Sequence, residues 1–308
     1  MIWFRLVFFS VASVMLVYLL RHYVFTAIVL IYGRYSKSAL RRSTWEPSVS
    51  VVIPAHNEEA VIGRLLERVV EFTYPKMKLQ VVVVDDGSVD KTGEIIDNFA
   101  SKYPFVKAIH RRSATGKAAA LNDALNYVTG EIVYFFDADY IPENDFVEKS
   151  NEGFCDLEVG LVQTNVRVYN ENKLVSKVVS LERLGGFRVN QLARDILGLI
   201  PQFGGTAGGV RCSLLQSVGG FDESVLAEDT DLTFRICFAG FKVRYLLGVG
   251  SFEEAVNDWR GYWRQRSRWS RGHMQCAFKH VGPLMKNRNL TLREKLDGFL
   301  LLNIYFVP

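Results

Sequence analysis

Hydrophobic residues follow two different patterns along this chain. Residues 1–33 are almost continuously apolar, whereas residues 48–140 alternate short β-branched runs with longer segments that have the period of a helix. Continuous apolar runs are typical of strands covered on both faces, and their alternation with helices predicts a mainly parallel sheet in an α/β domain. The expected strands and helices are, in chain order, Val49–Ile53, Glu58–Phe72, Leu79–Val84, Asp90–Lys102, Val106–His110, Lys117–Val128 and Ile132–Phe136.

The apolar N-terminal segment has the length of a membrane span. Leu6–Leu20 alone would rise roughly 22 Å as a helix, and an extension to Ile2 or to Ile31 reaches the ~30 Å of a bilayer core. We interpret residues 1–33 as one transmembrane helix. A cleaved signal peptide is the alternative, but no small-residue cleavage pattern follows Leu20 and more apolar sequence comes after it.

Basic residues come directly after this segment, in a linker of residues 34–47. They are Arg34, Lys37, Arg41 and Arg42. Because positive residues beside a membrane span tend to remain on the cytoplasmic side, we expect a cell-membrane protein whose main domain, residues 48–257, is cytoplasmic.

The last part of the chain also has a membrane character. Between Trp259 and Leu292 there are eight Lys or Arg residues and no acid, interleaved with aromatic residues. We interpret residues 258–297 as a basic amphipathic segment at the lipid headgroups, and residues 298–308 as the start of a further transmembrane helix. A nucleic-acid face is the alternative, but no recognised binding module accompanies it, so we expect no nucleic-acid partner.

Composition narrows the class of protein. The chain has 308 residues, of which 49% are hydrophobic, and this excludes a disordered chain and a disulfide-held miniprotein. The net charge of +4 is too small to indicate nucleic acid by itself. The four cysteines are far apart without a CxxC pair, so neither a zinc site nor a disulfide framework is indicated.

Acidic residues follow two of the expected strands. Asp85 and Asp86 follow Leu79–Val84, and Asp137 and Asp139 follow Ile132–Phe136. Ligands of α/β sheets bind outside the carboxyl ends of the strands, and residues two apart in an extended chain point to the same side. Paired carboxylates there suit Mg²⁺ or Mn²⁺, with a diphosphate completing the ligands. An ordinary acidic turn is the alternative for each pair.

A third acidic group opens a later helical stretch at Glu228–Asp229. A general base must stand apart from the metal ligands, and Asp229 fits that role best. Asp231 is explained by the favourable position of an acid at a helix start. The glycine-rich run Gly204–Gly209 lacks the context of a dinucleotide fingerprint, and we expect it to let the backbone approach a ligand or another segment closely.

Read in order, these motifs resemble the family 2 inverting glycosyltransferases, in particular the membrane-bound branch of cellulose, chitin, hyaluronan and poly-N-acetylglucosamine synthases. The resemblance covers about residues 48–275. It is carried by Ile53–Glu59 (IPAHNEE), Val84–Ser88 (VDDGS), Gly116–Asn122 (GKAAALN), Asp137–Asp139 (DAD), Gly205–Arg211, Glu228–Asp229 and the QxxRW signature Gln265–Trp269. The resemblance implies a GT-A, Rossmann-like nucleotide-sugar-binding domain, followed by an interfacial helix with QxxRW.

The resemblance also implies roles for single residues. The donor nucleotide would contact Pro54, Ala55, Asn57, Glu58, Asp85, Asp86, Lys117, Asp137, Gln265 and Arg268. The acceptor would contact Gly205, Thr206, Glu228 and Trp269. Asp139, helped by Asp137, would hold the metal, and Asp229 would be the catalytic base. A solvated lysine is the alternative for Lys117, and an ordinary interfacial tryptophan is the alternative for Trp269.

The implied activity is metal-assisted, inverting transfer of a sugar, with a UDP-sugar as the expected donor, to a growing polysaccharide. A single transfer to a lipid acceptor and a catalytically silent, membrane-tethered nucleotide-binding partner are the alternatives. Cellulose is not implied as the product, because Gln202–Thr206 stands where cellulose synthases have Phe-Cys-Gly. The sugar, the linkage and the oligomeric state are left open by the sequence.

Overall fold

The apolar runs form the centre of one sheet. Within residues 2–36 and 45–306, which the computed structural model describes, eight strands pair in the order β3-β2-β1-β4-β7-β6-β8-β5. Strands β3, β2, β1 and β4 are parallel, and β6 is parallel to β8. Strand β7 is antiparallel to β4 and β6, and β5 to β8. The bounds are β1 Val49–Ala55, β2 Leu79–Asp85, β3 Val106–His110, β4 Ile132–Phe135, β5 Tyr140–Pro142, β6 Val159–Val168, β7 Gly208–Arg211 and β8 Lys242–Glu253.

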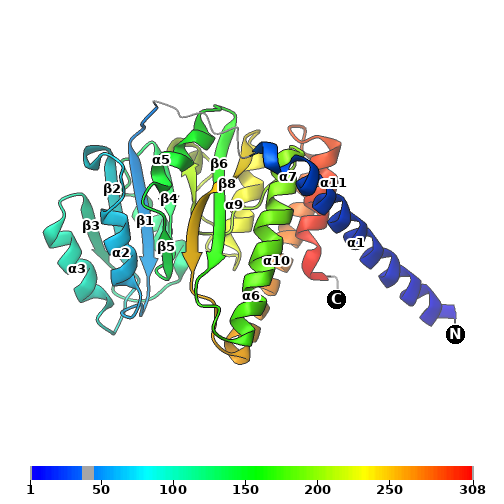
Figure 1. The fold of residues 1–308 in the computed structure, drawn as a ribbon, viewed down its shortest axis with the longest axis horizontal. Helices are drawn as coiled ribbons and strands as arrows, with labels where there is room; N and C mark the ends of the chain where they lie inside the picture. The colour runs from blue at the N-terminus through cyan, green and yellow to red at the C-terminus, as the bar shows by residue number, and fades with distance from the viewer. Residues whose placement is uncertain (1, 37–44, 307–308) are drawn as a thin grey trace.

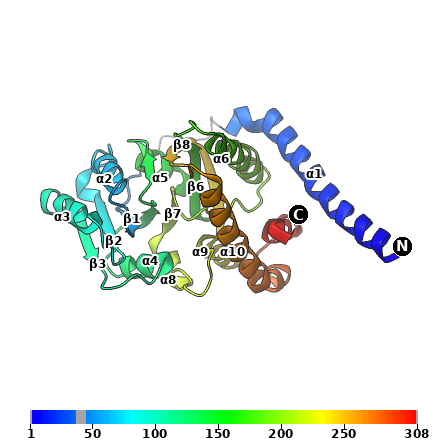
Figure 2. The same cartoon turned by 90° about the horizontal axis from the view of Figure 1, so that it is seen from below.

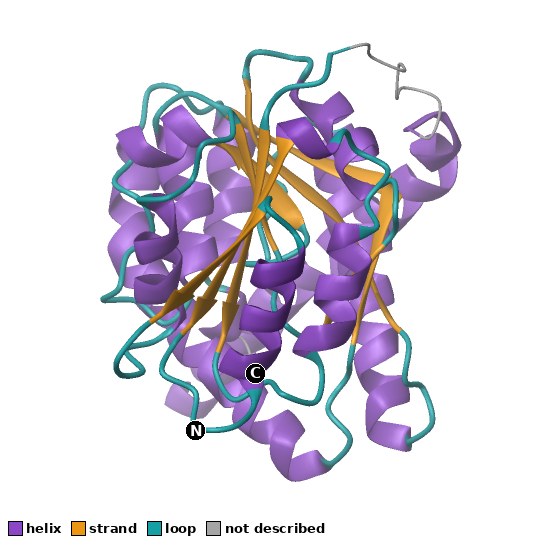
Figure 3. Ribbon diagram, turned by 90° about the vertical axis from the view of Figure 1, so that its left-hand side faces the viewer, coloured by secondary structure: helices purple, strands orange, loops and turns teal. Residues whose placement is uncertain are grey.

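Helices cover both faces of this sheet, as Figure 3 shows. Their bounds are α1 Ile2–Ser36, α2 Ile62–Val70, α3 Thr92–Lys102, α4 Lys117–Leu125, α5 Phe146–Asn151, α6 Leu174–Leu184, α7 Leu192–Ile196, α8 Cys212–Ser217, α9 Glu228–Phe238, α10 Trp259–Lys286 and α11 Leu292–Leu302. The shorter helical segments are η1 Lys76–Lys78, η2 Glu152–Phe154, the π-helix η3 Gly185–Gln191 and η4 Ile304–Phe306. The predicted mainly parallel α/β fold is confirmed.

The alternation of side chains along the central strands explains the two-sided core. Val51 and Ile53 of β1 pack in one hydrophobic cluster with residues of α2, whereas Val52 packs in a second cluster with residues of α4 and α9. Successive residues of a strand point to opposite faces, so a strand that is apolar at every position has to be buried on both sides. The continuous apolar runs therefore occupy the middle of the sheet.

Helix α1 stands apart from this body. In Figures 1 and 2 its N-terminal part projects away from the sheet, while its C-terminal part lies beside α7 and η3. Trp3 is 81% exposed, whereas Phe25 is only 4% exposed. Residues Phe8–Gly33 are long and apolar enough to cross a membrane. Most of the predicted basic linker, including Lys37, Arg41 and Arg42, lies outside the described residues.

The basic C-terminal segment forms two helices, α10 and α11. Helix α11 begins with a capping box of Thr291 and Glu294 and continues to Leu302. The boundary that we predicted between residues 297 and 298 therefore falls inside one helix. Leu301 and Leu302 are buried in the hydrophobic cluster that also contains residues of β1, α4 and α9. Residues 307 and 308 lie outside the described part of the chain.

Candidate active site

The site is built at the carboxyl ends of the parallel strands. Asp85 is the last residue of β2 and Asp86 follows it, and both acids are buried. Asp85 accepts hydrogen bonds from the Ser88 amide (2.9 Å) and pairs with Nδ1 of His110 (3.1 Å). Burial alone would raise the pKa of Asp85, but the hydrogen bonds from Ser88 and His110 outweigh it and lower the pKa. Asp85 thus stays ionised and ties the turn after β2 to the end of β3.

Asp86 holds the loop that leads into α4. Its Oδ1 accepts from the Arg111 guanidinium (2.6 Å) and from the Thr115 amide (3.2 Å), while Oδ2 accepts from the Gly116 amide (3.0 Å). A carboxylate oxygen has two acceptor positions, so Oδ2 keeps capacity for one more donor. Gly87 has a φ of +69°, and a Cβ there would lie 2.8 Å from the backbone of this loop. A glycine is required where the two loops meet.

The end of β1 contributes the next group of predicted residues. Ala55, the register partner of Asp85, accepts a hydrogen bond from the Asp86 amide (2.8 Å), and Pro54 pairs with Val84. Asn57 has a φ of +54°, and its carboxamide accepts from the Val89 amide (2.9 Å). Burial, followed by the nearby Asp137, raises the pKa of Glu58. The β1 loop therefore runs from the β2 acids to the acids after β4.

Asp137 and Asp139 follow β4 and lie in a partly buried position. The Asp137 amide donates to Oγ1 of Thr206 (3.0 Å). Burial, together with the carboxylates of Asp137 and Glu253, raises the pKa of Asp139 from 3.8 to about 7. Acids that repel each other in this way are stabilised by a counter-cation.

Lys117, at the first position of α4, joins residues from three parts of the chain. Its Nζ lies 2.5 Å from Oδ1 of Asp137 and 3.8 Å from Oε1 of Glu228, and it donates to the Gly205 carbonyl (3.1 Å). Burial opposes the charge of Lys117, but the two carboxylates outweigh it and raise its pKa. The lysine that we expected at the donor phosphates pairs here with the acids.

Glu228 and Asp229 open α9 beside the same lysine. Burial raises the pKa of both carboxyls, although the nearby Lys117 opposes the shift. Oδ1 of Asp229 accepts from the Thr230 amide (2.6 Å). A Cβ on Gly205, whose φ is +77°, would lie 3.2 Å from Oδ2 of Asp229 and 3.3 Å from Nζ of Lys117. The glycine thus allows the backbone to approach both charged groups, as expected for the glycine-rich run.

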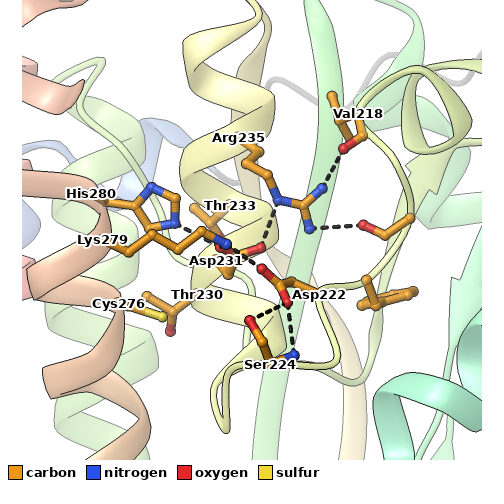
Figure 4. A network of polar contacts seen from close by, with 12 residues as sticks. Val218, Asp222, Ser224, Thr230, Asp231, Thr233, Arg235, Cys276, Lys279 and His280 are labelled. Atoms are coloured by element: carbon orange, nitrogen blue, oxygen red, sulfur yellow. Dashed lines mark hydrogen bonds and ion pairs between the residues drawn. The ribbon is translucent and has the colours of Figure 1, made fainter.

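A second charged network fixes the start of α9 against α10. Asp231 is fully buried and contacts Arg235 (2.6 Å), Lys279 (2.5 Å) and His280 (2.7 Å), as drawn in Figure 4. Asp231 therefore has a structural role, as expected. Its three ion pairs explain that role more directly than the favourable position of an acid at the start of a helix. A cavity of about 400 Å³ beside Asp222 and Arg235 contains none of the predicted site residues.

The QxxRW residues lie on α10. The Trp269 ring lies beneath two guanidiniums, with Cζ of Arg266 at 4.1 Å and Cζ of Arg183 at 5.1 Å from its centroid. Gln265 accepts a hydrogen bond from Arg266 (3.0 Å), and Arg268 is exposed. Among the described residues, no hydrogen bond or ion pair connects Gln265 or Arg268 to the acids around Lys117.

A divalent cation suits the acids after β4 only in part. In the described chain, no three His, Cys, Asp or Glu side chains form a ready set of metal ligands. Asp137 and Asp139 supply two hard oxygen ligands, and their mutual repulsion is the feature that a cation would relieve. The two carboxylates therefore fit a cation whose remaining ligands come from a diphosphate and water.

The structure thus brings together the predicted residues that end or follow strands β1, β2 and β4 or open helices α4 and α9. In the described part of the chain, Gln265 and Arg268 form no hydrogen bond or ion pair with them. Three charged groups of the site were not predicted. Arg111 holds Asp86, and Arg183 forms a partly buried ion pair with Glu253 beside Trp269. Each is an ordinary charged residue in its own segment, and only tertiary proximity reveals it.

Residues 50–219 match the family described as Glycosyl transferase family 2. The chain belongs to this family. The mannosyltransferase PcManGT from Pyrobaculum calidifontis, solved in complex with GDP-Man and Mn²⁺, is 27% identical and superposes with a TM-score of 0.70, covering 96% of this chain and 81% of that one. The GT-A fold that we predicted is confirmed.

Two curated relatives extend the comparison. The probable glycosyltransferase YdaM of Bacillus subtilis is 35% identical over 85% of this chain and 63% of its own length. The β-monoglucosyldiacylglycerol synthase of Nostoc sp. is 31% identical over 85% of this chain and 56% of its own length. The chain therefore spans little more than half the length of such relatives.

Proposed function

We propose that this glycosyltransferase moves a sugar from a nucleotide diphosphate donor to an acceptor hydroxyl with inversion at the anomeric carbon, and that it acts at a membrane. The observation that carries the proposal is the contact of Lys117 with Asp137, Glu228 and Gly205. This lysine connects Asp137, which we assign to the donor, with Glu228 and Gly205, which we assign to the acceptor. Sugar transfer itself is supported by membership of the family.

The donor side is formed by the strand ends. Asp86 retains one acceptor position for the nucleotide base, and Asp85 supports the turn that carries it. Asp137 and Asp139 would hold Mg²⁺ or Mn²⁺, which would neutralise the charge of the departing diphosphate. PcManGT, which was solved with Mn²⁺, supports this assignment. Lys117 lies close enough to Asp137 to exchange its carboxylate partner for donor phosphates.

Asp229 is the proposed base. It takes the proton from the acceptor hydroxyl, which then attacks the anomeric carbon opposite the nucleotide. The raised pKa of Asp229 makes its carboxylate a stronger base than an exposed aspartate. Gly205, which has no side chain, leaves room beside Asp229, and Thr206 follows it in the chain. Trp269 would offer a flat surface to the acceptor, and Arg268 would meet the leaving diphosphate.

Two acceptor classes fit this reaction. The order of motifs, including QxxRW, favours extension of a polysaccharide, and a UDP-sugar is the corresponding donor. A single transfer to a lipid is the second candidate, because the Nostoc relative is named a β-monoglucosyldiacylglycerol synthase. Product length separates the two: a polysaccharide synthase yields a ladder of products, and a lipid glycosyltransferase yields one glycolipid.

The base assignment is tested with Asp229→Asn. The purified chain is incubated in turn with UDP-Glc, UDP-GlcNAc, UDP-GlcA and GDP-Man, and nucleotide release is measured with acceptor present. Asp229→Asn should lose transfer while its nucleotide affinity stays within about threefold of the wild-type value; the exposed Glu67→Gln is the matched control. Substantial transfer by Asp229→Asn contradicts the base assignment. If the wild-type chain releases no nucleotide from any donor, the silent-partner alternative is favoured.

The membrane-crossing part of α1 is proposed to be its N-terminal half. The apolar window Phe8–Gly33 is centred near Arg21, yet Arg21 forms an ion pair with Asp297 of α11 (2.7 Å), and Arg194 of α7 binds the same carboxylate (2.9 Å). Placing the charged cluster of Arg21, Arg194 and Asp297 at the centre of a bilayer would cost free energy. Ile2–Leu20 would rise about 28 Å, which is enough to cross.

In this arrangement the Arg21–Asp297 pair lies at the bilayer surface, and the catalytic body is held against the cytoplasmic face. The arrangement is tested with single cysteines at two exposed positions of α1, Ser13→Cys and Ala27→Cys, in a chain whose Cys155 and Cys212 are replaced by serine. In proteoliposomes, a membrane-impermeant maleimide should label position 27 and not position 13. Equal labelling of both positions would contradict the placement of Ile2–Leu20 within the bilayer.

A further inference from the structure

A partly buried ion pair connects α6 with the end of β8. Arg183, in the last turn of α6, donates two hydrogen bonds to Glu253 at the end of β8, from Nε to Oε1 (2.5 Å) and from Nη2 to Oε2 (2.8 Å). Glu253 is only 5% exposed. Such a two-point contact fixes the plane of the guanidinium as well as its position.

One end of this pair reaches the acids after β4. Oε2 of Glu253 also accepts the hydroxyl hydrogen bond of Tyr140 (2.6 Å), and Tyr140 is the register partner of Glu253 in the β5–β8 pair. Tyr140 directly follows Asp139 in the chain. The position of Glu253 is therefore tied to the backbone that carries Asp139.

The other end reaches the tryptophan of QxxRW. Cζ of Arg183 lies 5.1 Å from the centroid of the Trp269 ring, and the neighbouring Glu182 binds Arg266, whose guanidinium lies 4.1 Å from the same centroid. Of these two adjacent residues of α6, Arg183 supplies one of the cations over the ring and Glu182 binds the other. The π-helix η3 begins two residues after Arg183, and such wide turns are common at functional sites.

We propose that Arg183, held by Glu253, is a positioning residue that sets the orientation of the Trp269 ring for the acceptor and links it, through Tyr140, to the Asp137–Asp139 segment. This inference rests on the proposed function for the role of Trp269. The ring can present a flat face to an acceptor only while it is kept from rotating about its side-chain bonds. A guanidinium over the ring attracts its π-face and opposes that rotation.

The test uses a variant that removes both charges together. Arg183→Met alone would leave Glu253 buried without a partner and could unfold the chain. The double variant Arg183→Met/Glu253→Gln avoids this, and the carboxamide that it introduces can still accept from Tyr140. The control is Arg188→Met, an exposed arginine five residues further along. The first readout needs no substrate: the ¹⁹F resonance of 5-fluorotryptophan at position 269, assigned with Trp269→Phe, should shift in the double variant and not in the control.

The second readout separates acceptor positioning from donor binding. With the donor that the wild-type chain uses best, and with diacylglycerol vesicles or a β-gluco-oligosaccharide as acceptor, the double variant should lower transfer relative to donor hydrolysis by about 10- to 100-fold. The acceptor KM should rise and the nucleotide Kd should stay unchanged. In a Trp269→Phe background the same pair of substitutions should have no further effect.

Each outcome decides the proposal. An unchanged ¹⁹F resonance, or a loss that is equally large in the Trp269→Phe background, shows that Arg183 does not act through Trp269 and overturns it. A shifted resonance in a chain that transfers no sugar to any acceptor supports the positioning contact and refutes the proposed function instead.

Discussion

Replacing Asp139 by asparagine should stabilise the protein in the absence of metal. Its carboxyl has a pKa raised from 3.8 to about 7, first by burial and then by Asp137 and Glu253. An acid whose pKa is raised in the folded state contributes stability below its unfolded pKa and loses it as the pH rises through the folded value. The native state therefore becomes progressively less stable, through this group, between about pH 4 and pH 7.

The size of the effect follows from the same pKa values. A change from 3.8 to about 7 corresponds to at most ~4 kcal/mol, since each pKa unit is worth about 1.4 kcal/mol. Asparagine has nearly the same shape and carries no charge, so the variant should recover this free energy of unfolding fully at pH 8 and only about half of it near pH 5.5. At roughly 2 °C per kcal/mol, the melting temperature should rise by no more than about 8 °C at pH 8.

The assay is thermal unfolding of Asp139→Asn and wild-type protein in detergent with EDTA, from pH 5 to pH 8, with Glu67→Gln as the control for loss of one exposed carboxylate. Mn²⁺ should raise the melting temperature of the wild-type protein at pH 8 and leave that of Asp139→Asn almost unchanged. If the variant melts within about 1 °C of the wild type at pH 8, or if its advantage is equal at pH 5 and pH 8, burial of an ionisable Asp139 is not the cause.

Two further substitutions test the packing around the site. Gly205→Ala should lower transfer by about tenfold or more with little change in nucleotide affinity, because its Cβ would lie 3.2 Å from Asp229 and its φ of +77° disfavours alanine. The control is Gly185→Ala, where a Cβ would meet no atom within 4 Å, and this variant should keep full transfer activity. Asp231→Ala should destabilise the chain by ~3–5 kcal/mol in urea unfolding, because Arg235, Lys279 and His280 lose their shared partner; a loss below about 1 kcal/mol would show that the network contributes little.

The strands could be predicted closely because their signal is local. The predicted Leu79–Val84 is observed as Leu79–Asp85, and Val106–His110 agrees at both ends. The helix after β1 was predicted to begin at Glu58 but begins at Ile62. Asn57 takes a left-handed conformation, with a φ of +54°, and its side chain binds the loop after β2 instead of starting a helix. This conformation of Asn57 depends on a contact with Val89, 32 residues away in the chain. The local hydrophobic periodicity carries no information about such a contact.

The acids of the site were predictable for a different reason. Asp86, Asp139 and Asp229 follow strands or open a helix, and parallel strands bring their carboxyl ends to one edge of the sheet. Their partners were not predictable. Arg183 meets Glu253 across 70 residues, and Lys117 meets Gly205 across 88, so the neutralising contacts depend on tertiary distance alone. The sequence thus indicated which acids follow the strands or open a helix, and it missed the contacts that balance their charge.

The charge balance of the site leads to a last prediction, on the order of binding. Lys117 is the only Lys or Arg in the described part of the chain that forms an ion pair with any of five neighbouring carboxylates. The five are Glu58, Asp137, Asp139, Glu228 and Asp229. A diphosphate that enters beside them is repelled, and one extra unit charge at ~8 Å costs about 2 kcal/mol at an effective dielectric constant of about 20.

A cation held by Asp137 and Asp139 would reverse the sign of this local interaction. Calorimetric titration of UDP or GDP at pH 8 should therefore show affinity at least about 100-fold weaker in EDTA than in Mn²⁺. The difference should narrow at pH 6, where the carboxyl of Asp139, with its pKa of about 7, is mostly protonated and adds less repulsion. Equal nucleotide affinity in EDTA and Mn²⁺ at pH 8 would show that Lys117 and backbone amides alone outweigh the acids, and that the site accepts its donor without a metal.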